Sequence, residues 1–339
     1  VAHRQNWARV ETLWIIKYNA GPDGKLAFDF SNFDRWVQIL LDAGIEKIES
    51  LQFAWRMGKW DEPFGVETHV AGEIGYQGGK AYRGKMVAPD SAEAREFYSQ
   101  FFPALTAHLR EKGWLDKVVQ HVGDEPVSGN AESWMTAAKL VRDYAPELPI
   151  MEACLSHEMV GFIDIWVPIL QHLHKDFAFF QERQKAGDEL WFYTCVNPQG
   201  EYANRFLEQP LIKTRLLHWI NFRYNLTGYL HWGYNFWRPH PWDNGADAKA
   251  PLPAGDMNIV YPAKDGFGII GSIRWEAMRD GIEDHELLSQ LGERDPEAAN
   301  ALARRMVLDF DEYETDVGAF RAVRRELLEG VGAGRGGVE

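Results

Sequence analysis

The sequence predicts an α/β protein: a (β/α)8 TIM-type barrel with additional C-terminal helices. Segments typical of strands alternate with segments typical of helices up to Ser272, which is the pattern of a parallel sheet with helical crossovers. Eight segments are candidate strands. No Gly-x-Gly-x-x-Gly or Walker-type loop follows any of them, which weakens the case for a nucleotide-binding, doubly wound sheet. After Ser272 the pattern is helical.

The expected strands are short runs rich in β-branched and aromatic residues. In chain order they are residues 12–18, 47–55, 118–122, 150–153, 163–167, 190–194, 228–232 and 257–261. The expected helices are residues 33–43, 92–112, 131–143, 175–186, 211–224, 273–291, 295–317 and 320–329. Ser91 is a typical cap for the second of these helices, and Gly113 a typical end. The Gly-rich segment 56–89 is long for a loop, which is typical of a functional loop or one that contains a short element.

We expect the chain to comprise a barrel over residues 1–291, a helical extension packed on it over 292–329, and a disordered Gly-rich tail over 330–339. Hydrophobic residues make up 45% and charged residues 25% of the chain, which is typical of a globular protein and excludes disorder as its main state.

The charge pattern excludes several classes of partner. The chain has 36 Lys and Arg against 50 Asp and Glu, a formal net charge of −14, and no Lys- or Arg-rich run. Nucleic acid and anionic membranes are therefore poor partner candidates. No apolar run approaches the roughly 18 residues that span a bilayer, so we expect no membrane insertion. Cys154 and Cys195 lie in apolar stretches and no His-Glu-x-x-His spacing occurs, so we expect no disulfide framework, no metal and no other cofactor.

Two adjacent carboxylates follow the expected strand 118–122. Active sites of TIM-type barrels lie at the carboxyl ends of the strands, and this strand runs into Gly123, Asp124, Glu125 and Pro126. Gly123 permits unusual backbone angles, which would turn both carboxyl groups into one cleft, and Pro126 favours an extended Glu125. Neighbouring carboxylates repel, which keeps one of them protonated near neutral pH, as a general acid requires. The alternative is that the pair only caps the next helix or forms surface ion pairs.

An adjacent pair suits one glycosidase mechanism better than the others. Ordinary retaining and inverting enzymes place two carboxyl groups on opposite sides of the anomeric carbon, about 5 to 9 Å apart, and neighbouring residues do not easily straddle a sugar. An adjacent pair can serve a substrate whose own 2-acetamido oxygen attacks the anomeric carbon. Glu125 would then protonate the leaving oxygen, while Asp124 would hold the acetamido N–H and stabilise the oxazolinium charge.

Aromatic and polar residues at other expected strand ends predict a sugar-binding cleft. The chain contains 14 Trp, 12 Tyr and 19 Phe, and their rings offer apolar faces to sugar C–H groups while Trp and Tyr add polar edges for hydroxyls. The substrate-binding candidates are Tyr193, Trp232, Asn235, Trp237, Trp166 and His157, with Tyr193 expected to hold the acetamido carbonyl. Core packing is the alternative for each aromatic residue, and a structural role is the alternative for His157.

Three stretches resemble glycoside hydrolase family 123 and the larger set of proteins that shares its catalytic domain. They are residues 122–126 (VGDEP), residues 228–237 (GYLHWGYNFW), and residues 261–262 followed by 272–284 (SIRWEAMRDGIED). The resemblance implies a (β/α)8 barrel and a retaining, exo-acting β-N-acetylgalactosaminidase that uses substrate assistance. It also implies that Asp124 orients the acetamido group and that Glu125 is the acid/base.

The sequence departs from the family pattern in two ways. Family members resemble longer proteins with a β-sandwich before the barrel, which is not seen here, and their carboxylate pair follows the fourth strand instead of the third. A further strand within residues 56–89 would account for the second difference. We expect Arg274, Glu276 and Asp280 to pair at helical spacing. The resemblance implies a secreted or periplasmic protein, although the chain begins at Val1 and no signal peptide precedes the fold.

The sequence therefore predicts a β-N-acetylhexosaminidase with a preference for N-acetylgalactosamine. Its substrate would be a glycan or glycoconjugate with a terminal β-linked N-acetylhexosamine. One alternative is a two-carboxylate glycoside hydrolase acting on another hexoside, with Glu125 as the acid and Glu152 or Glu201 as its partner. Another is a non-catalytic carbohydrate-binding barrel, and a metal-dependent hydrolase is the third.

Overall fold

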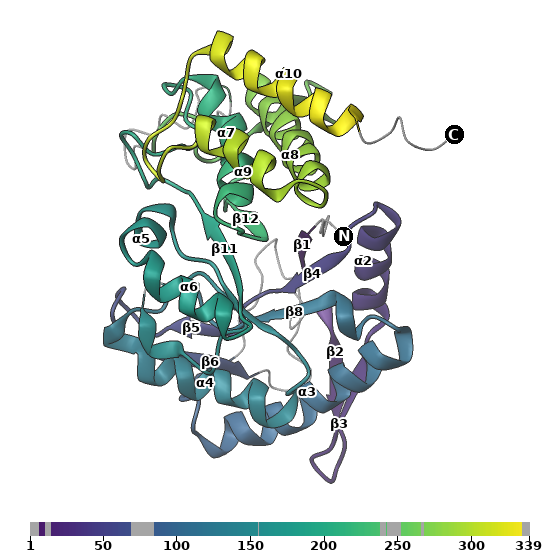
Figure 1. Ribbon diagram of the computed structural model, residues 1–339. Helices are drawn as coiled ribbons and strands as arrows, with labels where there is room; N and C mark the ends of the chain where they lie inside the picture. The colour runs from purple at the N-terminus through teal and green to yellow at the C-terminus, as the bar shows by residue number, and fades with distance from the viewer. Residues whose placement is uncertain are drawn as a thin grey trace. The chain divides into compact units, whose positions relative to one another are not determined.

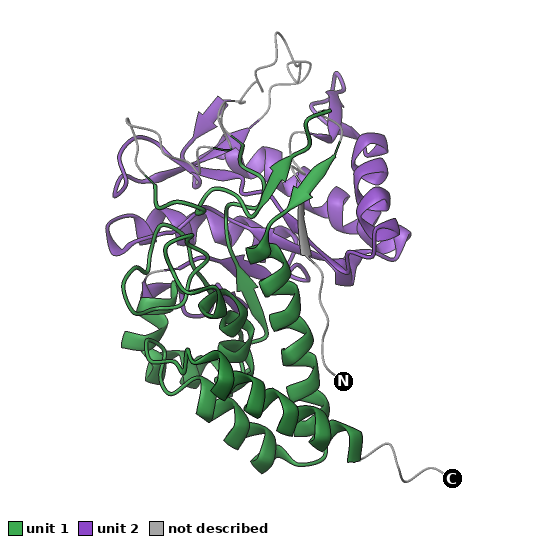
Figure 2. Cartoon of the chain, turned by 90° about the horizontal axis from the view of Figure 1, so that it is seen from above, with its two compact units in different colours: residues 1–3, 168–339 green, residues 4–167 purple. Residues whose placement is uncertain are grey.

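A computed structural model of the chain describes residues 7–10 (backbone only), 15–68, 85–154, 156–237, 242, 252–265 and 268–333. The chain divides into two compact units (Figures 1 and 2). We call residues 4–167 the N-terminal unit, and residues 168–339 with residues 1–3 the C-terminal unit. This division falls at a different place from the boundary expected after residue 291, which stays a prediction.

The N-terminal unit is built on parallel strands connected by helices, which confirms the predicted α/β class. Five strands are hydrogen-bonded in the order β1 (Trp7–Val10), β4 (Lys47–Ser50), β8 (Val118–His121), β9 (Ile150–Glu152) and β10 (Ile165–Trp166). The helices of this unit are α2 (Ser31–Asp42), α3 (Ala92–Lys112) and α4 (Ala131–Tyr144), with short 3-10 helices η1 (Leu115–Lys117), η2 (Ser128–Asn130) and η3 (His157–Met159). Ser91 caps α3 as predicted, because its Oγ accepts a hydrogen bond from Ala94 N, and Gly113 ends the helix in the left-handed conformation.

Two antiparallel sheets complete the N-terminal unit and correct the sequence-based assignment. β2 (Lys17–Ala20) pairs antiparallel with β3 (Leu26–Asp29), so the apolar run 12–18 is not the first parallel strand. The first parallel strand is β1, which precedes this run in the sequence. β5 (Ala54–Arg56), β6 (Phe64–Thr68) and β7 (Lys85–Val87) form the other sheet within the long Gly-rich segment. No described residue of that segment forms a parallel strand, so the carboxylate pair follows the third described parallel strand of the chain.

The C-terminal unit contains two parallel strands and most of the helices. β11 (Glu189–Tyr193) pairs with β12 (Gly228–Leu230) in parallel register, with Phe192 opposite Tyr229. The predicted helix 175–186 is replaced by two helices, α5 (Leu170–Lys175) and α6 (Phe177–Lys185), and α7 (Leu211–Arg223) connects the two strands. The expected parallel strand 257–261 is wrong, because β13 (Val260–Pro262) pairs antiparallel with β14 (Ile269–Gly271).

The last helices are α8 (Ile273–Gly292), α9 (Pro296–Met306) and α10 (Val317–Ala333) (Figure 1). The carboxylate of Asp284 in α8 is buried and connects three helices: it accepts hydrogen bonds from Arg215 Nε of α7 at 2.6 Å, Trp219 Nε1 of α7 at 3.2 Å and Arg324 Nε of α10 at 2.9 Å. Because α10 continues to Ala333, residues 330–333 are helical and not disordered. The rest of the expected tail lies outside the described residues.

The expected pairing of Arg274 with its helical neighbours is also wrong. The Arg274 guanidinium is buried and donates hydrogen bonds of 2.8 Å to the carbonyl oxygens of Arg205, Gly255 and Asn258. Asp280 instead accepts from Arg215 Nη1 at 3.1 Å. Within the described part of the chain, no helix combines the length and the apolar character needed to cross a membrane.

Candidate active site

The predicted carboxylate pair lies where β8 ends in the N-terminal unit. Asp124 is exposed and Glu125 is half-buried, whereas Val122 and Gly123 before them and Pro126 after them are buried. The two acidic side chains are therefore the solvent-accessible part of a segment that is otherwise inside the protein.

The backbone of this segment is held by side chains from four other parts of the N-terminal unit. Gly123 N donates to Glu152 Oε2 (3.2 Å), Trp134 Nε1 donates to Gly123 O (3.0 Å), Asp124 N donates to Gln52 Oε1 (3.2 Å), and Arg56 Nη2 donates to Glu125 O (2.7 Å). Such a set fixes the position from which both carboxylates project, because the peptide groups 122–123, 123–124 and 125–126 cannot rotate without losing hydrogen bonds.

Glu125 adopts a left-handed backbone conformation, with φ of 47°. The sequence suggested an extended Glu125 before Pro126, and this expectation is wrong; Gly123, where unusual angles were expected, is not among the glycines with positive φ. A non-glycine residue in this region is strained by roughly 1 to 3 kcal/mol and persists only where its surroundings impose it. Gly123 serves a different purpose: a Cβ at this position would lie 2.8 Å from Phe64 Cε1 and 3.2 Å from Ala54 O.

Three ionisable side chains from neighbouring strands lie next to this segment, and we call them the Glu-His-Glu array. Glu49 Oε1 of β4 lies 3.0 Å from His121 Nδ1 of β8, and His121 Nε2 lies 2.9 Å from Glu152 Oε1 of β9. All three residues are buried. Burial acts to lower the pKa of His121, but the charges and hydrogen bonds of Glu152 and Glu49 outweigh it and raise that pKa to about 10.

The contacts of the Glu-His-Glu array argue against Glu152 as the catalytic partner of Glu125, a role that the sequence left open. Glu152 has no exposed surface and its carboxylate is engaged by His121, Gly123 and Trp134, so it does not reach a sugar in this structure. Glu201, the other candidate partner, lies in the C-terminal unit with its side chain 87% exposed and 3.7 Å from Lys213 Nζ.

Arg56 is a residue of this site that the sequence did not reveal. It is half-buried in β5, donates to the Glu125 carbonyl, and stacks over the Trp60 ring with its guanidinium carbon 3.9 Å from the ring centroid. Burial lowers the pKa of Arg56, and the charges of Asp124, Glu125 and Glu152 oppose that shift. Its positive charge therefore faces the carboxylate pair.

The predicted aromatic residues divide between exposed and buried positions. In the C-terminal unit, Trp232 is 43% exposed, Asn235 is exposed and Trp237 is half-buried with Nε1 donating to Val260 O at 2.8 Å, whereas Tyr193 is only 4% exposed. In the N-terminal unit, His157 is exposed on η3. Trp166 is completely buried in β10, so its ring offers no face to a ligand, and core packing, the alternative reading, accounts for it.

Trp232 is hydrogen-bonded to a buried set of side chains in the C-terminal unit, Asp256, His231 and Arg205, that the sequence did not reveal. Its Nε1 donates to Asp256 Oδ2 at 3.1 Å, and Asp256 Oδ1 lies 3.4 Å from His231 Nε2. His231 Nδ1 lies 2.6 Å from Arg205 Nη2.

The pKa values of this set of side chains are shifted. Burial, followed by the charges of Arg205 and Arg274, lowers the pKa of His231 well below its usual value. Burial raises the pKa of Asp256 to about 6. Arg205 and Asp256 come from loops without a sequence pattern, so nothing in the sequence singles them out.

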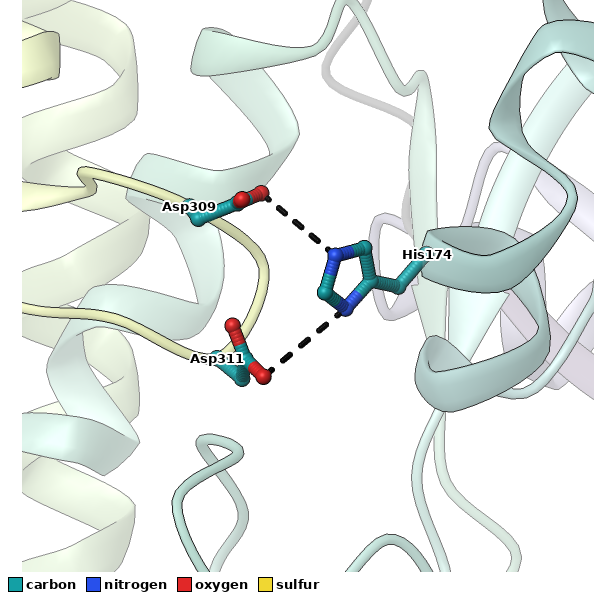
Figure 3. A group of neighbouring side chains, drawn as sticks. All are labelled: His174, Asp309 and Asp311. Atoms are coloured by element: carbon teal, nitrogen blue, oxygen red, sulfur yellow. Dashed lines mark ion pairs between the residues drawn. The ribbon is translucent and has the colours of Figure 1, made fainter.

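One further group in the C-terminal unit combines residue types that bind metals. Figure 3 shows His174 of α5 between Asp309 and Asp311, and their ligand atoms all lie within 4.8 Å of one another. Each ring nitrogen faces a different carboxylate, Nε2 to Asp309 at 3.7 Å and Nδ1 to Asp311 at 4.0 Å, and Tyr202 Oη lies 2.9 Å from Nδ1. A histidine binds an ion through one nitrogen, so the arrangement fits ion pairs that hold α5 to this loop.

The fold places the chain among the TIM-type α/β proteins. A family 123 glycoside hydrolase from Clostridium perfringens, whose structural analysis concerned the hydrolysis of glycolipid glycans, is similar with a TM-score of 0.66 and 20% identity. The similarity covers 97% of this chain and 60% of that protein, so the chain spans less than two thirds of its length. A xylanase of family 10 from Thermobacillus composti is a more distant match, with a TM-score of 0.42, 9% identity, and coverage of 81% and 89% of the two chains.

The sequence itself identifies the family. The family model described as "Glycoside hydrolase 123, catalytic domain" matches residues 3–291, so the chain belongs to glycoside hydrolase family 123. The resemblance stated from the three sequence stretches is thereby confirmed, and so is the predicted fold class. Among curated protein sequences none matches the chain.

Proposed function

We propose that this protein is a retaining, exo-acting β-N-acetylhexosaminidase with a preference for N-acetylgalactosamine, and that it uses substrate-assisted catalysis. The observation that carries the proposal is the pair of accessible, adjacent carboxylates, Asp124 and Glu125, at the end of β8 in a family 123 catalytic domain. Adjacent residues fixed at the backbone suit a reaction in which the substrate supplies its own nucleophile, since both carboxyl groups approach the sugar from one side.

In this mechanism the two carboxylates have different tasks. Glu125 donates its proton to the glycosidic oxygen as the carbonyl oxygen of the 2-acetamido group attacks the anomeric carbon, which breaks the glycosidic bond and forms an oxazolinium. Asp124 accepts a hydrogen bond from the acetamido N–H and stabilises the positive charge. Glu125, now ionised, takes a proton from the water that opens the ring, so two inversions at the anomeric carbon give net retention.

Residues that bind substrate are proposed one at a time, each from its own surroundings. Trp232 presents an exposed indole whose orientation is fixed by Asp256, and Asn235 and Trp237 follow it in the same loop. Tyr193, at the end of β11, is proposed to hold the acetamido carbonyl, and the exposed His157 a hydroxyl. The substrate is a glycan or glycoconjugate with a terminal β-linked N-acetylhexosamine, consistent with the glycolipid glycans named for the Clostridium perfringens protein.

The proposal is tested with aryl β-hexosides that carry or lack a 2-acetamido group. We expect turnover only of the acetamido substrates, with the galacto sugar preferred over the gluco sugar, and inhibition by a thiazoline mimic of the cyclised intermediate. Equal hydrolysis of a substrate without the acetamido group would instead support a two-carboxylate hydrolase. Sugar binding without any turnover would support a non-catalytic barrel.

Variants of the pair sharpen the test. Glu125→Gln should lower kcat by at least about 100-fold for substrates with poor leaving groups and much less for activated aryl glycosides, because only the former need the acid. Asp124→Asn should impair both classes. Glu132→Gln is the matched control, since Glu132 is an exposed carboxylate in the first turn of α4, and it should retain the activity of the unmodified protein.

A further inference from the structure

The Glu-His-Glu array is not explained by the stability of the sheet. Removing a charged group from water costs several kcal/mol, and replacing a buried ion pair by apolar residues of similar volume is often neutral or stabilising. Glu49, His121 and Glu152 nonetheless occupy buried positions on three adjacent strands. Three buried ionisable groups therefore indicate a purpose other than packing.

The contacts of Glu152 indicate what that purpose is. Its Oε1 is engaged by His121 Nε2 at 2.9 Å. Its Oε2 accepts hydrogen bonds from Gly123 N at 3.2 Å and from Trp134 Nε1 at 3.1 Å. The carboxylate thus connects the array to the backbone N–H of Gly123, the residue before Asp124, and His121 and Glu49 hold it in that orientation.

Charge also connects the array with the active site. Burial raises the pKa of Glu152, His121 opposes that shift, and the nearby charge of Asp124 adds to it. The other titratable groups that face Glu152 are Arg56, whose guanidinium is cationic, and Cys154, whose thiol is neutral because burial raises its pKa to about 12.

We propose that Glu152 is a positioning residue for the Asp124–Glu125 pair, oriented by His121 and Glu49. It fixes the backbone of Gly123, the residue before the pair. This inference rests on the proposed function for its kinetic readout and on the structure alone for its backbone readout.

Two substitutions separate the hydrogen bond from the charge. Glu152→Gln removes the charge but keeps an acceptor for Gly123 N, so kcat should stay within about tenfold of that of the unmodified protein. Glu152→Ala also removes the acceptor, and kcat should fall by about 100-fold with KM nearly unchanged, because small misplacements of catalytic groups have effects of that size.

Asp284→Asn is the matched control. Asp284 is likewise a fully buried carboxylate that accepts a hydrogen bond from a tryptophan, Trp219, and it lies in α8 of the C-terminal unit. The control should lower the melting temperature while leaving kcat and KM of the folded protein unchanged. If Glu152→Ala behaved like the control, with lower stability and unchanged kcat and KM, the array would be purely structural and the proposal would be wrong.

A readout without substrate keeps the inference separate from the proposed function. Amide hydrogen exchange at Gly123 should accelerate in Glu152→Ala and stay close to that of the unmodified protein in Asp284→Asn. If the unmodified protein turned over no acetamido substrate, the proposed function would fail, while faster exchange at Gly123 would still support the positioning role. Unchanged exchange at Gly123 would overturn it.

Discussion

The two units each contain a buried histidine in the same short pattern, His-x-Gly, but the two imidazoles differ in charge. His121 is followed by Val122 and Gly123 at the end of β8, and His231 by Trp232 and Gly233 directly after β12. Their side chains are 3% and 2% exposed. Two carboxylates raise the pKa of His121 to about 10, whereas burial and two arginines lower that of His231 far below its usual value.

This difference shows that burial alone does not determine the charge of a histidine. The cation at His121 is stabilised by Glu49 and Glu152 of the neighbouring strands, and the neutral ring at His231 accepts a hydrogen bond from the Arg205 guanidinium. In each case the groups that decide the charge come from other segments of the chain. Each histidine lies close to residues for which a function is proposed, the carboxylate pair after His121 and Trp232 after His231.

The largest expected effect comes from replacing each histidine by glutamine. His121→Gln should lower the free energy of unfolding by about 3 to 5 kcal/mol at pH 7, because it leaves two buried carboxylates without their cation. His231→Gln should cost only about 1 to 2 kcal/mol, since a neutral amide oxygen can still accept from Arg205. Denaturant unfolding of both variants checks the comparison, and equal losses would contradict it.

The contribution of His121 to the free energy of unfolding depends on pH, and the direction of this dependence follows from its raised pKa. Because its folded-state pKa lies above the unfolded value of about 6.5, the stability it contributes is fully present below that pH and is lost as the pH rises through about 10. The difference between the unmodified protein and His121→Gln should therefore shrink between pH 7 and pH 10. A constant difference would mean that His121 is neutral in the folded protein.

Replacing either glycine of the His-x-Gly pattern by alanine should lower stability by an intermediate amount. A Cβ at Gly233 would lie 2.5 Å from Asp256 O and 2.7 Å from Met257 O, both backbone atoms, whereas at Gly123 the closest contact is with the Phe64 ring. A ring moves more easily than backbone, so Gly233→Ala should destabilise by about 3 kcal/mol and Gly123→Ala by about 1 to 2 kcal/mol. Thermal unfolding of the two variants measures the order, and the reverse order would show that the segment around Gly123 is the more rigid.

A pH dependence from Asp256 should be of similar size to the effect of Gly123→Ala. Its pKa is raised from the usual 3.8 to about 6, so the unfolded chain binds fewer protons between these values and stability falls as the pH rises from about 4 to about 6. The loss should amount to about 2 kcal/mol, and Asp256→Asn should remove it. The same slope in both proteins, measured by urea unfolding at several pH values, would exclude Asp256 as its source.

The position of the carboxylate pair could be predicted from the sequence, but its surroundings could not. Gly123, Asp124, Glu125 and Pro126 stand together after a clear strand, so the strand end could be located without a structure. The partners of their backbone, among them Gln52, Arg56 and Trp134, come from distant segments, and a single sequence carries no signal for such contacts. The left-handed Glu125 is likewise imposed by these partners against the local preference of a residue before proline.

The two strands that were wrongly predicted to be parallel also have a physical explanation. Residues 12–18 form an apolar run, and an apolar run predicts burial without specifying parallel or antiparallel pairing. The same holds for residues 257–261, where Tyr261 of β13 pairs with Ile270 in an antiparallel hairpin. Helices with clear caps were easier to place: α3 has the predicted bounds, since Ser91 and Gly113 mark both of its ends.

The buried Asp284 carboxylate also bears on how the chain could be shortened for expression. The family match ends at residue 291, but Arg324 and Phe320 of α10 lie beyond it. A protein that stops at residue 291 would lose the Arg324 hydrogen bond to Asp284 and the contact of Phe320 with the Trp219 ring, 5.7 Å between centroids. The limit of recognisable sequence similarity is therefore not a safe cutting point, and expression vectors should encode α10 in full.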